Sequence, residues 1–169
     1  MTSEQLIDIL TLQKHPNEGG FFRETYRSAA TLAPAQLPPG YPSRRSLATA
    51  IYYLLTPASL SLMHRVVGDE IFHHYLGDAV EMLWLHPGGE SEVLMLGGDL
   101  AAGQRPQVVV PGGVWQGSRL MSGGKHGFAL LGTTMSPGFD YADYEHGRRE
   151  ALLALYPARE VEIRALTLA

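Results

Sequence analysis

The sequence contains no cysteine, so no disulfide can stabilise the fold, and this is typical of cytoplasmic proteins. No apolar run approaches the ~20 residues that a membrane helix needs, and the first four residues lack the basic start of a signal peptide. Excess positive charge is also absent, because the formal net charge is −4. That balance gives no basic surface for nucleic acid. We therefore expect a cytoplasmic protein that binds neither membrane nor nucleic acid.

The length and composition predict a single domain. The chain has 169 residues, of which 45% are hydrophobic and 18% charged, as is ordinary for a globular protein with a buried core. No repeat or low-complexity tract divides it. Within one domain spanning 1–169 we expect an N-terminal helix and arm strand (1–28), a β-barrel core (44–134) and a C-terminal segment with a helix (135–169).

Glycine and proline, 19 and 11 residues respectively, separate short apolar runs along most of the chain. Short strands at such spacing are typical of all-β architecture. We expect strands at 21–28, 47–55, 61–67, 70–76, 80–86, 92–96, 107–110, 114–120 and 127–134. Helical periodicity predicts an N-terminal helix capped by Ser3 and reaching Lys14, and a C-terminal helix from Arg148 to Leu155, before Pro157.

Polar side chains concentrate between residues 61 and 77, on two strands joined by a tight Gly68-Asp69 turn. His64 precedes the turn and Glu70 follows it, with His73 and His74 further along the second strand. This arrangement would bring an imidazole and a carboxylate within reach of one small molecule or one ion.

These residues resemble a cupin signature. His64, Glu70 and Gly77 match the first cupin motif, in which Val66 occupies the position of the second histidine. Residues 111–116 resemble the second motif, with Gln116 at the position of its histidine. The stretches 18–26, 69–77, 110–116 and 136–141 further resemble the DUF985, or cupin-5, branch.

The resemblance implies an all-β fold, the double-stranded β-helix of an RmlC-like cupin jelly roll with N-terminal and C-terminal helices. It also implies a homodimer that pairs through a sheet face or by strand exchange. The apolar arm from Phe21 to Tyr26 would supply the contacts for such pairing.

The resemblance is poor support for a metal. A cupin metal centre uses two or three histidines with a glutamate, whereas valine offers no lone pair and an amide is a weak ligand. We expect no cofactor. If a divalent metal binds, its ligands would be His64, Glu70 and Gln116, completed by His73 or His74, and the chain would then be a metal-dependent oxygenase or isomerase.

The leading functional hypothesis is a small-molecule-binding cupin that holds a sugar, nucleotide or nucleotide-sugar-like ligand in its barrel. Metal-free epimerases that this fold resembles use a histidine base and a tyrosine acid. Here His64 would abstract a proton, Glu70 would orient the His64 imidazole, and Tyr75 or Tyr52 would return a proton. Those enzymes also carry a lysine, which no core strand has here. A non-catalytic ligand sensor or scaffold is the remaining alternative.

The facing of the strand after Glu70 stays open at this stage. If Glu70 points into the barrel, alternation puts Phe72 and His74 inside and His73 and Tyr75 outside. The DUF985-like pattern favours His73 and Tyr75 instead, and a bulge near Glu70 would reconcile the two. The candidate substrate-binding residues are Arg23, Thr25, Thr49, Tyr52, His73, His74, Trp115 and Gln116.

Overall fold

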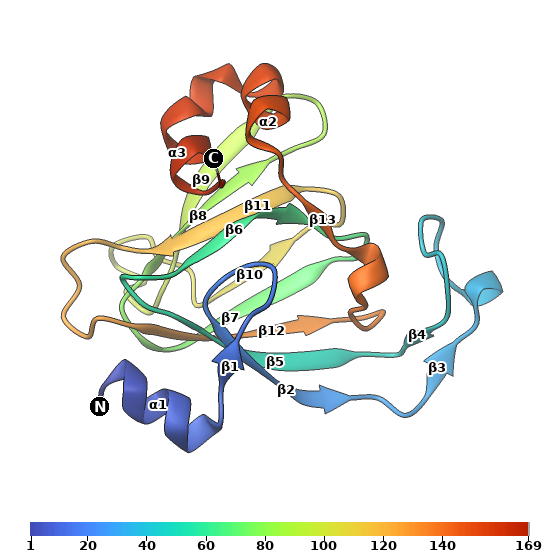
Figure 1. Ribbon diagram of the computed structural model, residues 1–169, viewed down its shortest axis with the longest axis horizontal. Coiled ribbons are helices and arrows are strands. Elements are labelled where there is room, and N and C mark those ends of the chain that lie inside the picture. Colours follow the sequence, from blue (N-terminus) through green and yellow to red (C-terminus); the bar gives the residue numbers. More distant parts are fainter. Residues whose placement is uncertain (169) are drawn as a thin grey trace.

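Two antiparallel sheets face each other and enclose the core of the protein, as the computed structural model shows for residues 1–168 (Figure 1). The strand order is β1-β2-β5-β12-β7-β10 in the six-stranded sheet and β13-β6-β11-β8-β9 in the five-stranded sheet. Strands that are distant in sequence are therefore neighbours in both sheets, as expected of a jelly roll. The predicted all-β fold is confirmed.

The strand bounds follow the predicted runs closely. The six-stranded sheet contains β1 (Gln13–Lys14), β2 (Phe21–Arg27), β5 (Thr49–Leu55), β7 (Glu70–Gly77), β10 (Gln107–Val110) and β12 (Ala129–Met135). The five-stranded sheet contains β6 (Leu60–Arg65), β8 (Val80–Leu85), β9 (Ser91–Leu96), β11 (Trp115–Leu120) and β13 (Glu145–His146). A separate pair, β3 (Thr31–Leu32) and β4 (Arg45–Ser46), extends away from the barrel (Figure 1). The sequence patterns missed the four two-residue strands.

The N-terminal helix α1 spans Ser3–Leu10, and its cap is Thr2 rather than the predicted Ser3. The Thr2 hydroxyl accepts the N–H of Gln5 while the Gln5 side chain accepts the N–H of Thr2, which is a capping box. The helix ends at Thr11, whose φ of 53° is left-handed, so the predicted continuation to Lys14 is wrong. Pairing with β2 draws the chain after Thr11 into β1 instead.

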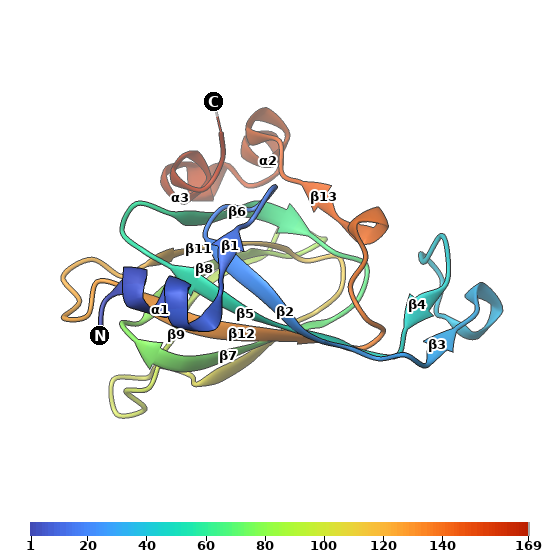
Figure 2. The ribbon, with the colours of Figure 1, turned by 60° about the horizontal axis from the view of Figure 1, so that its bottom comes forward.

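The C-terminal segment forms two short helices rather than one. Helix α2 (Arg149–Leu155) was predicted, whereas the 3-10 turn Pro157–Arg159 and helix α3 (Glu160–Ala165) were not. Both helices lie over the outer face of the five-stranded sheet, where Leu152 and Ile163 pack against Leu83 (Figure 2). None of the helices within residues 1–168 combines the length and apolarity required to cross a membrane.

The interior between the sheets is apolar at one end and hollow at the other. At the apolar end Leu55, Val80 and Leu131 are fully buried or nearly so. Towards the other end, the inward residues of β5, β7 and β12 become Thr49, Glu70 and Thr133 among others, and they line a cavity. The strand ends at the hollow end of the barrel therefore carry the polar groups, and the opposite end carries the apolar core.

The orientation of β7 follows strict alternation. Phe72 pairs with Thr133 and His74 with Leu131, which places both on the inner row with Glu70. His73 and Tyr75 point to the outer face, where their rings stack with centroids 6.1 Å apart. A bulge does occur, but it lies between His74 and Leu76, so it does not re-aim the residues near Glu70.

Candidate functional site

A cavity of about 260 Å³ opens between the sheets. Its walls come from β2, β5, β7 and β12, from the turn that follows β1, from Val66 directly after β6, and from the segment that follows β12. Four carboxyl groups lie on its walls, those of Glu18, Glu24, Glu70 and Asp140. Five aromatic rings accompany them, those of Phe22, Tyr53, Phe72, Phe139 and Tyr141.

Glu70 lies in the buried part of the wall and is 8% exposed. It is the first residue of β7, directly after a turn in which the Asp69 carboxylate accepts the N–H of Gly112 at 2.8 Å. The Gln116 amide donates to Glu70 Oε2 at 2.7 Å. The pKa of the Glu70 carboxyl is raised to about 7, mainly by burial. The charge of Glu18 also raises this pKa, and its effect is larger than the lowering by the hydrogen bond from Gln116.

Glu18 faces the same cavity from the turn between β1 and β2. Its side chain is 14% exposed, and its oxygens lie 3.7 Å from His15 Nε2 and 3.8 Å from His64 Nε2. Both separations are longer than a hydrogen bond. Burial raises the pKa of the Glu18 carboxyl to about 8. No sequence pattern had marked Glu18 as a candidate site residue.

The backbone around Glu18 is held firmly. Its N–H donates to His15 Nδ1 at 3.0 Å, and its carbonyl accepts the N–H of Leu62 at 2.8 Å. Gly19 follows with a φ of 91°, and a Cβ there would collide with the Leu60 carbonyl, so only glycine fits. A charged residue before two glycines was thus the available sequence signal for Glu18, although such turns are common.

His64 is 1% exposed and stands behind the wall rather than on it. Its Nδ1 lies 2.7 Å from the Leu62 carbonyl, which identifies Nδ1 as the protonated nitrogen and leaves the Nε2 lone pair towards Glu18. The ring stacks on Tyr144 with centroids 5.3 Å apart. Burial lowers the pKa of the His64 imidazole, so the ring is neutral near pH 7.

Gln116 and Trp84 extend this polar layer across the five-stranded sheet. Gln116 pairs with His64 on β6 and with Trp84 on β8, so the three side chains form one row. Gln116 Oε1 and Trp84 Nε1 are buried and have no hydrogen-bond partner among the described residues. Trp115, one residue away, points outward, and the Arg65 guanidinium lies over its ring at 4.5 Å.

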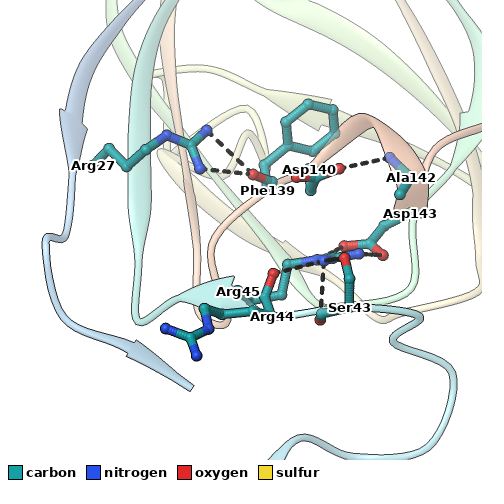
Figure 3. Close-up of polar contacts among 8 residues, drawn as sticks. All are labelled: Arg27, Ser43, Arg44, Arg45, Phe139, Asp140, Ala142 and Asp143. Atoms are coloured by element: carbon teal, nitrogen blue, oxygen red, sulfur yellow. Dashed lines mark hydrogen bonds and ion pairs between the residues drawn. The ribbon is translucent and has the colours of Figure 1, made fainter. Parts of the chain in front are cut away.

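Two arginines fix the segment at the cavity mouth (Figure 3). Arg27 donates twice to the Glu24 carboxylate, at 2.7 and 3.0 Å, and also to the Phe139 carbonyl at 3.2 Å. Arg45 forms a bidentate pair with Asp143, both side chains being 1% exposed, and one of its bonds measures 2.6 Å. Hydrogen bonds and a buried ion pair therefore hold the segment at the cavity mouth in place.

The predicted site residues divide into two groups. Thr49 and Glu70 line the cavity, and His64 and Gln116 stand directly behind it. The others lie elsewhere because the pleat turns them outward or because they bond to backbone outside the cavity. Three of them contact backbone carbonyls outside the cavity: Arg23 donates to Leu10, Thr25 donates to Ala50, and His74 contacts Asp78. The other four lie on outer faces of the sheets: Tyr52, His73, Tyr75 and Trp115.

The donor set does not fit a cupin metal centre. Val66 lines the cavity without a lone pair, and Gln116 directs its amide N–H, not its oxygen, at Glu70. Within the part of the chain that the structure describes, no group of three or more histidine, aspartate or glutamate side chains is arranged to hold an ion.

Several known proteins are similar to this chain. The uncharacterised protein YML079W of Saccharomyces cerevisiae is 34% identical over 149 residues, which cover 83% of this chain and 73% of that protein. The crystal structure of protein SO0799 from Shewanella oneidensis matches with a TM-score of 0.86 and 36% identity, over 99% of this chain and 98% of that one. A hypothetical protein from Leishmania major matches with a TM-score of 0.88 and 31% identity, with 100% of both chains covered.

More distant structures share the fold alone. Oxalate decarboxylase of Bacillus subtilis, a protein described with Mn(II) centres, is 13% identical with a TM-score of 0.52, over 92% of this chain and 37% of the decarboxylase. The jelly roll that the motifs predict is therefore confirmed. Residues 4–147 match the family described as Cupin_5, cupin superfamily (DUF985), and the chain belongs to that family.

Proposed function

We propose that the protein binds a small molecule the size of one sugar ring in the cavity between its sheets. The cavity of about 260 Å³ is smaller than the ~300–1,000 Å³ typical of sites for drug-sized ligands. Glu18, Thr49 and Glu70 offer oxygens to hydroxyl groups, while aromatic rings offer flat apolar surface to the carbons of a ring. This opposition of carboxyl groups and aromatic rings in one enclosed space is the observation that carries the proposal.

Among the ligand classes considered, this geometry favours a sugar over a nucleotide or a nucleotide-sugar. A phosphate entering the cavity would meet the carboxylate of Asp140 and the carboxyl groups of Glu18 and Glu70, which repel it once they ionise at about pH 7 to 8. The guanidinium on the wall, that of Arg27, is already bonded to Glu24. A neutral ring avoids both penalties.

Epimerase or isomerase chemistry is the catalytic form of this proposal. Because His64 does not reach the wall, it would act as a base through Glu18, whose carboxylate lies between the imidazole and the cavity. Glu18 as a carboxylate would take the proton from the carbon next to the sugar carbonyl, and Glu70 as an acid would protonate the carbonyl oxygen, so that the C–H electron pair forms the double bond of an enediol. Glu18 would then deliver its proton to the former carbonyl carbon while the other enediol hydroxyl returns a proton to Glu70, which restores both groups. The His64 lone pair would stabilise the protonated form of Glu18. In a sensor or scaffold, the same cavity binds without turnover.

A thermal-shift screen with monosaccharides, nucleotides and nucleotide sugars tests the binding. A ligand present at 100 times its Kd adds about 2.7 kcal/mol of stability, which raises the melting temperature measurably. Ile51→Phe narrows the cavity and should abolish the shift, whereas Ile71→Phe makes the same change on the outer face and should retain it.

The outcomes separate the alternatives. Stabilisation by monosaccharides that Ile51→Phe removes supports the proposal. A larger shift with nucleotides than with sugars contradicts the ligand class, and no shift with any compound contradicts the proposed function. Proton NMR of a sugar that binds, followed over time, then distinguishes an enzyme from a sensor. Metal analysis of the protein purified without a histidine tag tests the metal-dependent alternative.

A further inference from the structure

We propose that the ligand of this cavity carries a positively charged amine, so that the site selects an amino sugar or a comparable ring-sized amine over its neutral or anionic counterparts. This inference rests on the proposed function, since it adds a charge to the ligand of the same cavity. It follows from the balance of charged groups on the cavity walls.

The basic side chains on the walls do not neutralise the carboxyl groups. Arg27 is engaged by Glu24 through two hydrogen bonds, so that pair has no net charge. His15 Nδ1 accepts the backbone N–H of Glu18, which requires an unprotonated nitrogen. Burial also lowers the pKa of the His15 imidazole to about 4, so the ring is neutral at physiological pH.

Glu18 and Glu70 are therefore left without a cation. Within residues 1–168 neither forms an ion pair with lysine or arginine, and the nitrogens nearest to the Glu18 oxygens belong to two neutral histidines. An ionised carboxyl in a protein interior costs several kcal/mol unless an opposite charge and hydrogen bonds compensate it. Two such groups face one cavity here, and the protein supplies no counter-charge to either.

An ammonium group supplies what the walls lack. It brings one positive charge and three N–H donors, whereas within residues 1–168 the two histidine nitrogens beside the Glu18 oxygens lie 3.7 and 3.8 Å away, beyond hydrogen-bond distance. The aromatic rings of the walls add to this selection, because a cation is attracted to the face of a phenyl or phenol ring. Asp140, at the exposed mouth, contributes further negative charge.

The sign of the pH dependence follows from the same groups. The titratable and charged side chains around the cavity are Glu18, Glu24, Glu70, Asp140, Arg27 and His15 on the walls, with His64 and Tyr144 behind them and Tyr53 and Tyr141 alongside. Since burial raises the pKa of Glu18 to about 8 and of Glu70 to about 7, an ammonium ligand must displace protons from them. Its affinity should therefore fall as the pH drops through 8 and 7, where Glu18 and then Glu70 become protonated.

Isothermal titration calorimetry with matched probes tests the inference. The probes are D-glucosamine against D-glucose and N-acetylglucosamine at about pH 7, and cyclohexylamine, an alkylamine that stays protonated throughout, against cyclohexanol at about pH 8 and about pH 6. Each amine should bind at least about 10-fold more tightly than its neutral partner, which corresponds to about 1.4 kcal/mol. Binding of the amine should release protons and weaken at the lower pH.

Two isosteric variants locate the effect. Glu18→Gln and Glu70→Gln should each reduce the affinity for the amine by about 10-fold more than they reduce the affinity for its neutral partner, because only the amine loses the charge interaction. Glu81→Gln, which alters a surface pair with Arg119, serves as the control and should change neither. The comparison of probes on the unaltered protein keeps the test decisive if a variant folds poorly.

The results separate this inference from the proposed function. Equal or tighter binding of the neutral partner overturns the amine while leaving the cavity as a binding site. Binding of glucose 6-phosphate more tightly than glucosamine overturns it as well. Failure of every probe to bind, charged or neutral, overturns both.

Discussion

Glu18 and Glu70 place two carboxyl groups where ionisation opposes folding. Their pKa values in the folded protein, about 8 and about 7, lie above the ordinary glutamate value of 4.5. The folded state therefore binds more protons than the unfolded state between those values. The stability that protonation gives is complete below about pH 4.5 and is lost as the pH rises through 7 to 8.

Glu70→Gln should consequently make the protein less sensitive to alkali. A single titrating group can contribute a slope of up to about 1.4 kcal/mol per pH unit. We expect the free energy of unfolding of the parent protein to fall between about pH 6 and pH 8.5, and that of the variant to fall less. Urea denaturation at both pH values measures this, with Glu81→Gln as the control. Parallel curves for parent and Glu70→Gln would show that Glu70 does not titrate in this range.

The acid side should depend on His15. Burial lowers the pKa of the His15 imidazole to about 4. At pH values between 4 and the ordinary histidine pKa of 6.5, the folded state therefore binds fewer protons than the unfolded state. Stability should be lost as the pH falls from about 6.5 towards 4. His15→Gln should flatten that limb of the curve in thermal melts. An unaltered acid limb in the His15 variant would contradict this assignment.

How far single residues can be predicted from sequence depends on the distance over which their surroundings are assembled. The motif brought out His64, Glu70 and Gln116, because its spacing encodes strands that meet in the fold. It could not show that His64 lies one layer behind the wall, since Glu18 comes from a turn elsewhere in the chain. A cavity wall is a tertiary property, and local spacing does not contain it.

At the scale of elements, alternation proved sufficient for β7. It placed Glu70, Phe72 and His74 on one face, because the bulge comes only after His74. Local propensity failed at the end of α1, where apolar residues continue but pairing with β2 pulls the chain into β1. Two-residue strands carry no periodicity at all, so β3 and β4 were not predictable.

The element most dependent on a single interaction is the segment at the cavity mouth. The Arg45 and Asp143 side chains are buried, and the pair joins β4 to the turn Tyr141–Asp143 (Figure 3). Removing one member leaves the other charge buried and alone, at a cost of about 3–5 kcal/mol. Arg45→Met should therefore destabilise the protein by about that amount in urea denaturation.

The double variant Arg45→Met with Asp143→Leu isolates the charge effect. It should recover much of the lost stability, because neither charge then remains unpaired. Arg119→Met, which breaks an exposed pair with Glu81, should cost less than about 1 kcal/mol and serves as the matched control. If the double variant is no more stable than Arg45→Met, the pair acts through packing rather than charge.

At the scale of the whole molecule, each sheet has an outer face, and the two faces are covered differently. Helices α2 and α3 cover that of the five-stranded sheet. Helix α1 covers one end of the six-stranded sheet, where Leu6 packs near Leu54 and Leu130. Beyond it the face carries exposed apolar side chains, among them Tyr75 at 48% and Val109 at 47% exposure. Exposed apolar side chains on a sheet face are typical of interaction sites.

We expect the predicted homodimer to form through this outer face rather than by strand exchange. Phe21 packs with the cluster under α1 and Phe22 lines the cavity of its own chain, so the arm is already engaged. Tyr75→Glu puts a charge in the centre of the exposed face and should convert a dimer to a monomer in size-exclusion chromatography with light scattering. Val161→Glu, at a site 76% exposed on α3, should leave the mass unchanged. A parent protein that runs as a monomer at all concentrations would contradict the dimer. A dimer that survives Tyr75→Glu would have to use a different face, because burying an unpaired carboxylate on both copies costs too much free energy.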